Sequence, residues 1–415
     1  MSTDVLEPAP PRARTGLVRV AIGLFLGTVG YMLPFSAAST VLLPARIADL
    51  SPDHKVGLLA VLTGAAAVAG LVANVVFGAL SDVTRTRFGA RTPWILGGAV
   101  ATALLMVPIS RAGTFGELLA WWCLAAATLN ATLATLSAIL PDRVPVARRA
   151  TLSAVVGVGI LLGTALGALT GATFLGDPER GIQVTAVLLV ALTGTAVLVA
   201  PDSDNRDVAG GRLDVRVLAR SFRFPSGAPD FYWALWGRLL LVLGYFMVNG
   251  FQLYIFTDYV GLDEEATARA LSTNSVVFLV TALAGSALAG PLSDRLERRK
   301  VFVVGASLLA MTAVAIPFFV ATTGGMLGFA TVGGFAFGVY YSVDAALMSE
   351  VLPSSESRAR DLGILNMANT GGQVLAPAAS SLLVGLGIGF SPVFLGAVVM
   401  AVIGAACVTP IRSVR

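Results

Sequence analysis

The chain has 415 residues, of which 56% are hydrophobic and 13% charged, and its mean hydropathy is +0.83. The core of a soluble domain cannot bury so much apolar surface, and the apolar residues come in runs of 17 or more. These values exclude a soluble globular protein and indicate a chain that crosses a membrane many times.

Apolar runs predict the membrane spans, because about 20 helical residues cross a bilayer core about 30 Å thick. The runs lack the alternation of apolar and polar residues that barrel strands require, so we expect helices. The first run follows a polar tail and is too long for a cleavable signal. The twelve predicted spans lie near 17–43, 56–80, 93–109, 117–140, 152–175, 182–200, 232–257, 268–292, 301–321, 325–348, 362–387 and 391–410.

Lysine and arginine are distributed unequally over the connecting segments. One side of the predicted membrane holds 22 of them and the other five, while Arg238 lies inside a span. The positive-inside rule therefore predicts a multi-pass cell-membrane protein with both termini in the cytoplasm. The net charge of +4 then reflects this topology, and we expect no nucleic-acid partner.

An internal repeat divides the chain. GALSD at 78–82 recurs as GPLSD at 290–294, and ILP at 139–141 recurs as VLP at 351–353, both with an offset of 212. We predict a six-helix half at 1–200, a cytoplasmic middle loop at 201–230 and a second half at 231–415. Six spans in each half give the copies the same orientation, which is a parallel repeat.

The segment GALSDVTRTRFGARTPW at 78–94 resembles the signature that major facilitator superfamily carriers show between their second and third helices. Its longer form is similar to that of the glycoside–pentoside–hexuronide carriers and the sucrose–proton symporters, as is the seventh span. The resemblance implies the major facilitator fold and a secondary transporter that works by alternating access. We expect no enzymatic activity and no cofactor, and we expect a monomer in the lipid bilayer.

In that family the charges of this segment tie the two halves together while the cytoplasmic side is closed. The resemblance therefore implies gating roles for Asp82, Arg85, Arg87 and Arg91, and for Asp294 in the second copy. We expect Asp82 to accept hydrogen bonds from nearby arginines and from N–H groups at a helix start. A simple positive-inside anchor is the alternative.

Glycines in the fifth span predict a close helix contact. Gly159, Gly163, Gly167 and Gly171 follow one another at four-residue spacing, and such a face lets another helix approach closely. Rocking on this face is one interpretation, and packing alone is the other.

Polar and aromatic residues inside spans indicate a solute path, because polar groups are costly in lipid. In this architecture the first, fourth, seventh and tenth helices line the cavity, and aromatic rings beside hydroxyl and amide groups suit a sugar-like or amphipathic solute. The alternative role is hydrogen bonding between helices. The predicted cavity residues are Tyr31, Phe35, Asn130, Tyr245, Asn249, Gln252, Tyr340, Tyr341, Asn369 and Gln373.

Asp344 and Arg238 are the charges that we place well inside spans. Burial favours neutral Asp344, whereas a nearby Arg238 favours its ionised form. A change in their separation could therefore load and release a proton, and we predict Asp344 as the protonation site with Arg238 as its partner. A fixed structural ion pair is the alternative.

Spans 1, 2 and 4 contain no acidic residue at 21–43, 56–80 and 118–140, so we expect no sodium or other metal site of the melibiose-carrier type. No nucleotide-binding motif is present, and the fifth span lacks the Gly-Pro pair of proton-coupled drug exporters. The missing carboxylates favour a proton over sodium as the coupling ion, and the missing Gly-Pro pair argues against efflux. With the resemblance and the polar, aromatic spans, we expect proton-coupled uptake of a sugar or glycoside. Export of a drug or secondary metabolite is the main alternative, and a non-transporting sensor or assembly factor is a further one.

Overall fold

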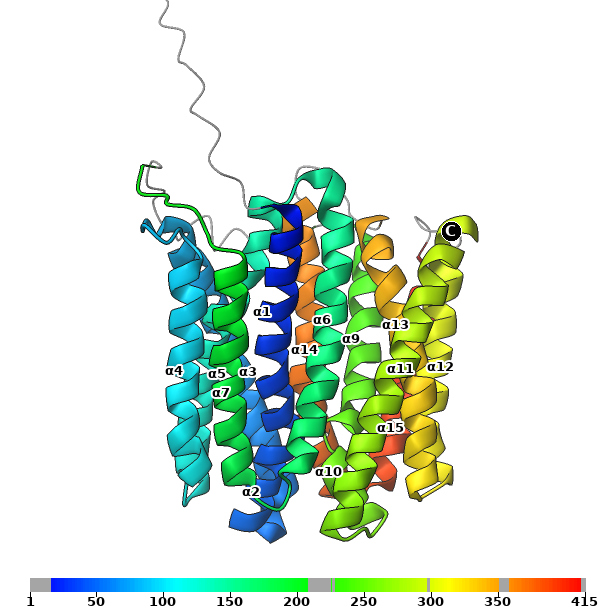
Figure 1. Ribbon diagram of the computed structural model, residues 1–415. Coiled ribbons are helices and arrows are strands. Elements are labelled where there is room, and N and C mark those ends of the chain that lie inside the picture. The colour runs from blue at the N-terminus through cyan, green and yellow to red at the C-terminus, as the bar shows by residue number, and fades with distance from the viewer. Residues whose placement is uncertain (1–15, 208–224, 226–227, 297–298, 351–357, 412–415) are drawn as a thin grey trace, which may run out of the picture.

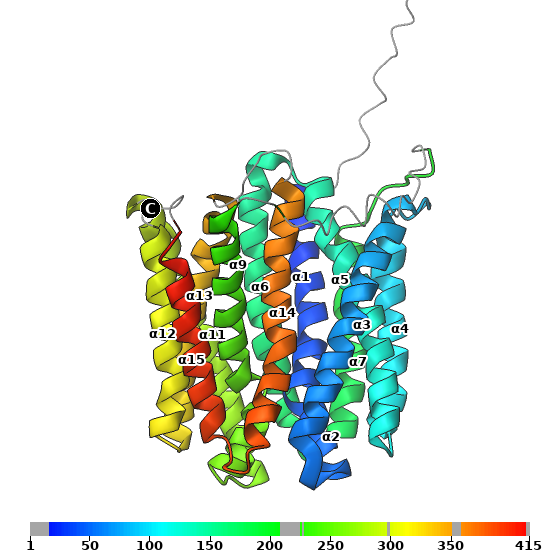
Figure 2. The same ribbon diagram turned by 180° about the vertical axis from the view of Figure 1, so that it is seen from behind.

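The computed structural model describes residues 16–207, 225, 228–296, 299–350 and 358–411, and within these residues it contains helices and no strand. The helices stand side by side in one bundle (Figure 1). The start of α1 and the end of α15 lie at the same end, which we call the termini end (Figures 1 and 2). The helices α2 and α10 lie at the other end, which we call the opposite end (Figure 1).

The helices divide into two sets with the predicted pattern. The first half contains α1 (Leu17–Ala37), α2 (Leu43–Leu50), α3 (Lys55–Val83), α4 (Thr92–Arg111), α5 (Phe115–Arg143), α6 (Val146–Thr173) and α7 (Pro178–Val199). The second half contains α9 (Pro229–Asn249), α10 (Gln252–Tyr254), α11 (Glu264–Leu296), α12 (Arg299–Phe319), α13 (Thr323–Glu350), α14 (Arg358–Val384) and α15 (Ser391–Val408).

Eleven of the described helices are long and apolar enough to cross a membrane. The remaining predicted span, 362–387, falls on α14, a continuous helix of 27 residues that runs beside the others in Figure 2. Polar residues such as Asn369 and Gln373 interrupt its apolar sequence. Each predicted span therefore has its helix, and the prediction of an all-α protein with two six-helix halves is confirmed. The exact division at 201–230 stays a prediction.

The first helix of each half is irregular toward the opposite end. After α1 the chain forms a π-helical turn, Ala38–Leu42, before α2, where Pro44 has no N–H to continue the α-helical hydrogen bonding. After α9, Gly250 and Phe251 interrupt the helix, and a second π-helical turn, Ile255–Tyr259, follows α10. The repeat offset of 212 relates 38–42 to 250–254, so both breaks occupy related positions.

The glycines of α6 pack against α1, which confirms the predicted close approach. A Cβ added to Gly163 would lie 2.6 Å from the Cβ of Met32, and one added to Gly167 would collide with the carbonyl oxygen of Leu33. Both helices belong to the first half. The glycines therefore account for tight packing within that half, and a role in rocking stays a prediction.

The apolar core differs between the two ends. At the opposite end one cluster contains side chains from both halves, including Ile47, Leu59, Tyr254, Phe256 and Leu271. Toward the termini end each half has a cluster of its own: one contains Val20, Leu24, Ile95 and Leu136, and the other contains Phe231, Leu241, Val303 and Val343. The described apolar contacts therefore join the halves at the opposite end.

Candidate functional site

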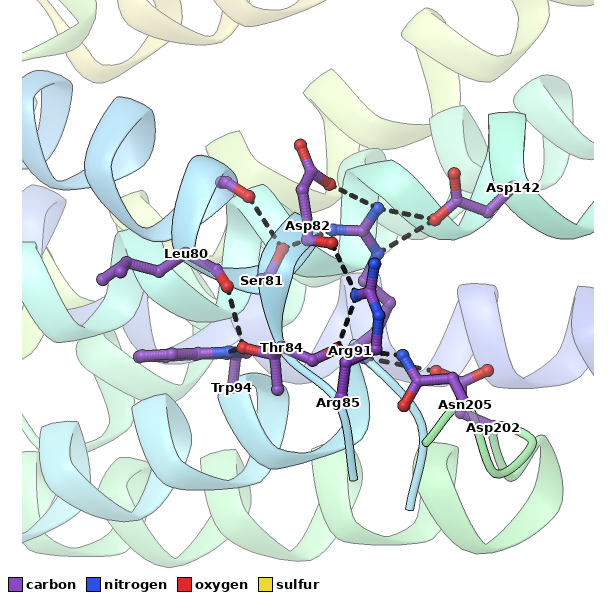
Figure 3. Close-up of polar contacts among 11 residues, drawn as sticks. Leu80, Ser81, Asp82, Thr84, Arg85, Arg91, Trp94, Asp142, Asp202 and Asn205 are labelled. Atoms are coloured by element: carbon purple, nitrogen blue, oxygen red, sulfur yellow. Dashed lines mark hydrogen bonds and ion pairs between the residues drawn. The ribbon is translucent and has the colours of Figure 1, made fainter. Parts of the chain in front are cut away.

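The loop between α3 and α4, at the termini end, is organised around Arg91 (Figure 3). The guanidinium Nε donates to Oδ2 of Asp142 at 2.9 Å, and Nη2 lies 2.7 Å from both Oδ2 of Asp142 and Oδ1 of Asp82. Nη1 donates to the hydroxyl of Ser81. We call these four residues the Arg91 cluster. It joins the end of α3, the start of α4 and the end of α5.

The environment of Arg91 keeps it charged. Burial disfavours the guanidinium charge, but the hydrogen bonds and Coulomb attraction of Asp142 and Asp82 outweigh burial and raise the pKa of Arg91 above its ordinary value. The Arg91 side chain is 10% exposed, whereas those of Asp82 and Asp142 are 65% and 44% exposed. A buried cation thus holds two carboxylates that remain partly hydrated.

The segment that follows α7 binds the same loop. Oδ2 of Asp202 accepts the N–H of Arg91 at 3.2 Å. Oδ1 of Asn205 accepts the N–H of Thr86, and its Nδ2 donates to the carbonyl oxygen of Thr84, both at 2.9 Å. Asp202 and Asn205 thereby fix the loop from a second side (Figure 3).

The remaining predicted gating residues are placed differently. Nη1 of Arg85 donates to the carbonyl oxygens of Asp82 and Thr84, where a cation is favoured at the C-terminal end of a helix. Arg87 is exposed and lies over the ring of Phe88, 4.5 Å from its centroid. Asp294 belongs to α11, but its side chain lies outside the described residues.

One expectation about Asp82 is wrong. Asp82 lies in the last turn of α3, which ends at Val83, so it does not accept N–H groups at a helix start. Asp202 accepts the Arg91 N–H at the start of α4 instead. Three further residues of this site, Asp142, Asp202 and Asn205, were not predicted from the sequence. Asp142 directly follows the repeated ILP motif, which was an available signal, whereas no local spacing indicated the other two.

The predicted cavity residues of the first half lie in contacts within that half. Tyr31 is 5% exposed, its ring lies 6.1 Å from that of Phe35, and it packs with Ala99 and Leu129. Asn130 accepts a hydrogen bond from Nδ2 of Asn74 on α3 at 3.4 Å. Its own Nδ2 donates to the carbonyl oxygen of residue 126 at 2.9 Å. In this conformation Asn130 therefore links α5 to α3.

In the second half, residues of α9 and α10 form a connected polar group. Nε2 of Gln252 donates to Oδ1 of Asn249 at 2.7 Å, and the Tyr245 hydroxyl contacts the same oxygen at 3.5 Å. The Tyr245 ring lies 4.3 Å from that of Phe337 on α13, and the Phe337 ring lies 4.9 Å from that of Tyr341. Aromatic and amide groups are thus brought together, as the sequence analysis expected of a solute site.

The other predicted cavity residues of this half differ in exposure. Tyr340 is buried, whereas Tyr341 is 42% exposed. Gln373 is half-buried on α14. Oδ1 of Asn369 is buried and has no hydrogen-bond partner among the described residues. A buried acceptor without a partner calls for an explanation, and a bound polar solute would supply one.

The predicted proton-coupling pair is only half described. Arg238 is half-buried on α9, and Asp344 belongs to α13, but the side chain of Asp344 lies outside the described residues. Their separation is therefore not defined, and the pair stays a prediction.

Comparison with known proteins identifies the family. The sequence model of the Major Facilitator Superfamily matches residues 24–264 and 239–414, which together span nearly the whole chain. The chain belongs to the major facilitator superfamily. The predicted superfamily is thus confirmed, and the narrower likeness to glycoside–pentoside–hexuronide carriers stays a prediction.

Curated relatives of this superfamily member match over part of their length. It is 25% identical over 207 residues to the MFS transporter asaE of Aspergillus flavus, covering 49% of this chain and 43% of the relative. It is 29% identical over 168 residues to the cis,cis-muconate transport protein of Acinetobacter baylyi, covering 40% of this chain and 38% of the relative. The chain thus matches less than half the length of these relatives.

Solved structures share the fold over nearly the whole chain. A bacterial homolog of the human lysosomal transporter Spinster, in an inward-facing and unoccupied conformation, has a TM-score of 0.71 at 14% identity and covers 94% of this chain and 96% of its own. A mutant of the nucleoside transporter NupG has a TM-score of 0.73 at 14% identity and covers 94% and 99%. At this identity the likeness concerns the fold alone.

Proposed function

We propose that this member of the superfamily is a secondary active transporter that carries a small organic solute by alternating access. The proposal depends on the difference between the two ends of the bundle. At the opposite end the halves share an apolar cluster, Nζ of Lys55 pairs with Oδ1 of Asp258 at 2.8 Å, and the Tyr254 hydroxyl donates to the carbonyl oxygen of Pro44 at 2.8 Å. At the termini end the described clusters are separate. Alternating access requires two bodies that can part at one end while they are held at the other.

We place the termini end in the cytoplasm, because the segments at that end carry 22 of the 28 lysines and arginines. The conformation described is then closed toward the outside. The bundle is expected in the cell membrane as a monomer.

A sugar or glycoside is the solute class that we favour, since Tyr245, Asn249 and Gln252 combine an aromatic ring with hydroxyl and amide groups. An organic acid is the second class. Its support is Arg238, a cation inside a span, together with the likeness to the cis,cis-muconate transport protein. Export of a drug or secondary metabolite is the competing function.

The test is solute flux in proteoliposomes that contain the purified protein. The panel comprises sugars, glycosides, cis,cis-muconate and amphipathic drugs, each with and without a pH gradient. Accumulation of a sugar driven by an inward proton gradient supports the favoured function, and drug extrusion supports the alternative. The absence of movement for every solute class, with a correctly folded protein, would contradict transport and favour a sensor.

We further propose that Asp344 carries the coupled proton and that Arg238 is its partner. Asp344→Asn is then expected to abolish pH-driven accumulation while solute exchange persists, because exchange needs no net proton movement. A purely structural pair predicts instead that Asp344→Asn impairs folding and that Arg238→Leu partly restores it. Full pH-driven accumulation by a well-folded Asp344→Asn protein would exclude the proton role.

A further inference from the structure

Four residues at the opposite end connect the two halves, and we call them the Lys55 lock: Lys55, Asp258, Tyr254 and Pro44. Lys55 is the first residue of α3, and its ammonium group lies 2.8 Å from the Asp258 carboxylate and 5.0 Å from the centroid of the Tyr254 ring. The Tyr254 hydroxyl donates to the carbonyl oxygen of Pro44. Lys55 of the first half thus contacts Asp258 and Tyr254 of the second half. Tyr254 in turn contacts Pro44 of the first half.

The lock lies on the irregular parts of the two related helices. Pro44 follows the π-helical turn of the first half, Tyr254 belongs to α10, and Asp258 belongs to the π-helical turn after it. The Tyr254 side chain is almost fully buried, at 1% exposure of the residue. The hydroxyl of a buried tyrosine needs a partner, so movement of α10 away from α2 requires breaking or replacing its hydrogen bond.

The positions that the repeat relates to Lys55 and Asp258 cannot form the same ion pair. The offset of 212 relates Lys55 to Thr267 and Asp258 to Arg46, so the related positions carry no acid to pair with an arginine. Nη2 of Arg46 instead donates to the carbonyl oxygen of Ala112 within the first half. The Thr267 hydroxyl is buried and has no hydrogen-bond partner within the part of the chain that the structure describes. The repeat-related positions therefore do not form a second ion pair equivalent to that of Lys55 and Asp258.

We propose that the Lys55 lock sets the equilibrium between the conformation closed at the opposite end and one open at that end. The inference depends on the proposed alternating access. The apolar contacts at this end lack directionality, whereas the ion pair and the tyrosine hydrogen bond require one relative position of the halves. Because the Lys55 and Asp258 side chains are 20% and 35% exposed, removing the pair is expected to change the equilibrium by roughly 1.4- to fivefold, not to abolish closure.

The experiment measures the distance between the halves directly. Spin labels are attached to Gly116→Cys and Ala321→Cys, with Cys123 and Cys407 replaced by serine. Gly116 is exposed with open space around an added Cβ, and Ala321 is exposed in the loop before α13. In Lys55→Gln and in Asp258→Asn, pulsed electron resonance is expected to show a roughly 1.4- to fivefold rise in the ratio of long to short distances. Tyr254→Phe should also raise the ratio, because it removes the buried hydrogen bond between the halves.

The matched control is Arg269→Gln. It removes the same charge at the same end, but Arg269 pairs with Glu265 within α11, so the distance ratio should not change. The exchanged pair, Lys55→Asp with Asp258→Lys, should restore the distances of the original protein. An equal response to Lys55→Gln and Arg269→Gln, or no restoration by the exchanged pair, would overturn the proposal.

The distances are measured without solute, so this test separates the lock from the transport proposal. A protein that moves no solute in the panel can still show the lock, which would contradict transport alone. Unchanged distances in variants that retain solute flux would contradict the lock alone.

Discussion

A cation with acidic partners organises each end of the bundle, but the two arrangements differ in what they join. Arg91 binds Asp82 and Asp142, and all three belong to the first half. Lys55 binds Asp258 across the two halves. The Arg91 side chain is 10% exposed and pairs with two carboxylates. The Lys55 side chain is 20% exposed and, among the described residues, pairs with one carboxylate. The more buried arrangement lies within one half, and the more exposed one lies between the two halves.

In the proposed alternating-access cycle the contact between the halves is broken in every turnover, so its free energy must be modest. A partly exposed ion pair contributes about 0.2–1 kcal/mol, whereas a hydrogen bond to a charged group contributes about 1.5–3 kcal/mol. The Lys55 pair falls in the first range and the Arg91 cluster in the second. Three predictions test this distinction.

The largest effect is expected at Arg91. Arg91→Gln removes the cation between two carboxylates and is expected to lower the free energy of unfolding of the first half by about 2 kcal/mol. Thermal unfolding in detergent measures this change, and initial rates of solute flux should fall with it. Arg87→Gln is the matched control, because Arg87 is exposed and should change stability by less than about 0.5 kcal/mol. Equal effects of the two substitutions would show that Arg91 stabilises the protein no more than an exposed surface charge does.

A smaller effect is expected at Asn205. Asn205→Ala removes the two hydrogen bonds to the α3–α4 loop and should lower stability by about 1 kcal/mol, since the side chain is half-buried. Thermal unfolding is again the measurement. Ser203→Ala, at an exposed neighbouring position, should leave the unfolding temperature unchanged. An unchanged unfolding temperature in Asn205→Ala would mean that the segment after α7 does not stabilise the α3–α4 loop.

The smallest effect concerns salt. An increase from about 0.1 M to about 1 M shortens the screening length from about 10 Å to about 3 Å and weakens exposed pairs most. The ratio of long to short distances in the original protein should therefore rise toward that of Lys55→Gln. The expected rise is less than twofold. The stability difference between the original protein and Arg91→Gln should persist. High salt could instead remove both the difference in distance ratio at Lys55 and the difference in stability at Arg91. The burial of Arg91 would then not make its ion pairs stronger than that of Lys55.

The residues predicted to line a solute cavity show where local patterns were informative. The spacing of Tyr245, Asn249 and Gln252 predicts one helical face, and in the structure these side chains contact one another. The helix breaks after Asn249, however, and the ring of Tyr245 packs against Phe337 from another helix. Tyr31 and Asn130 were predicted to line the cavity from their residue types and spans alone, and they lie in contacts within the first half.

The sequence by itself determined the number of spans, the two halves and the glycine face of α6 on which another helix packs closely, whereas the structure identified that helix as α1. Bilayer thickness fixes the length of each apolar run, the repeat fixes the halves, and glycine spacing fixes a face without side chains. Only the tertiary structure decided which charges meet. Arg91 and Asp142 are 51 residues apart, and Lys55 and Asp258 are 203 apart. Partners at such distances depend on how whole helices are arranged, and helical periodicity relates only residues within a few turns of one another.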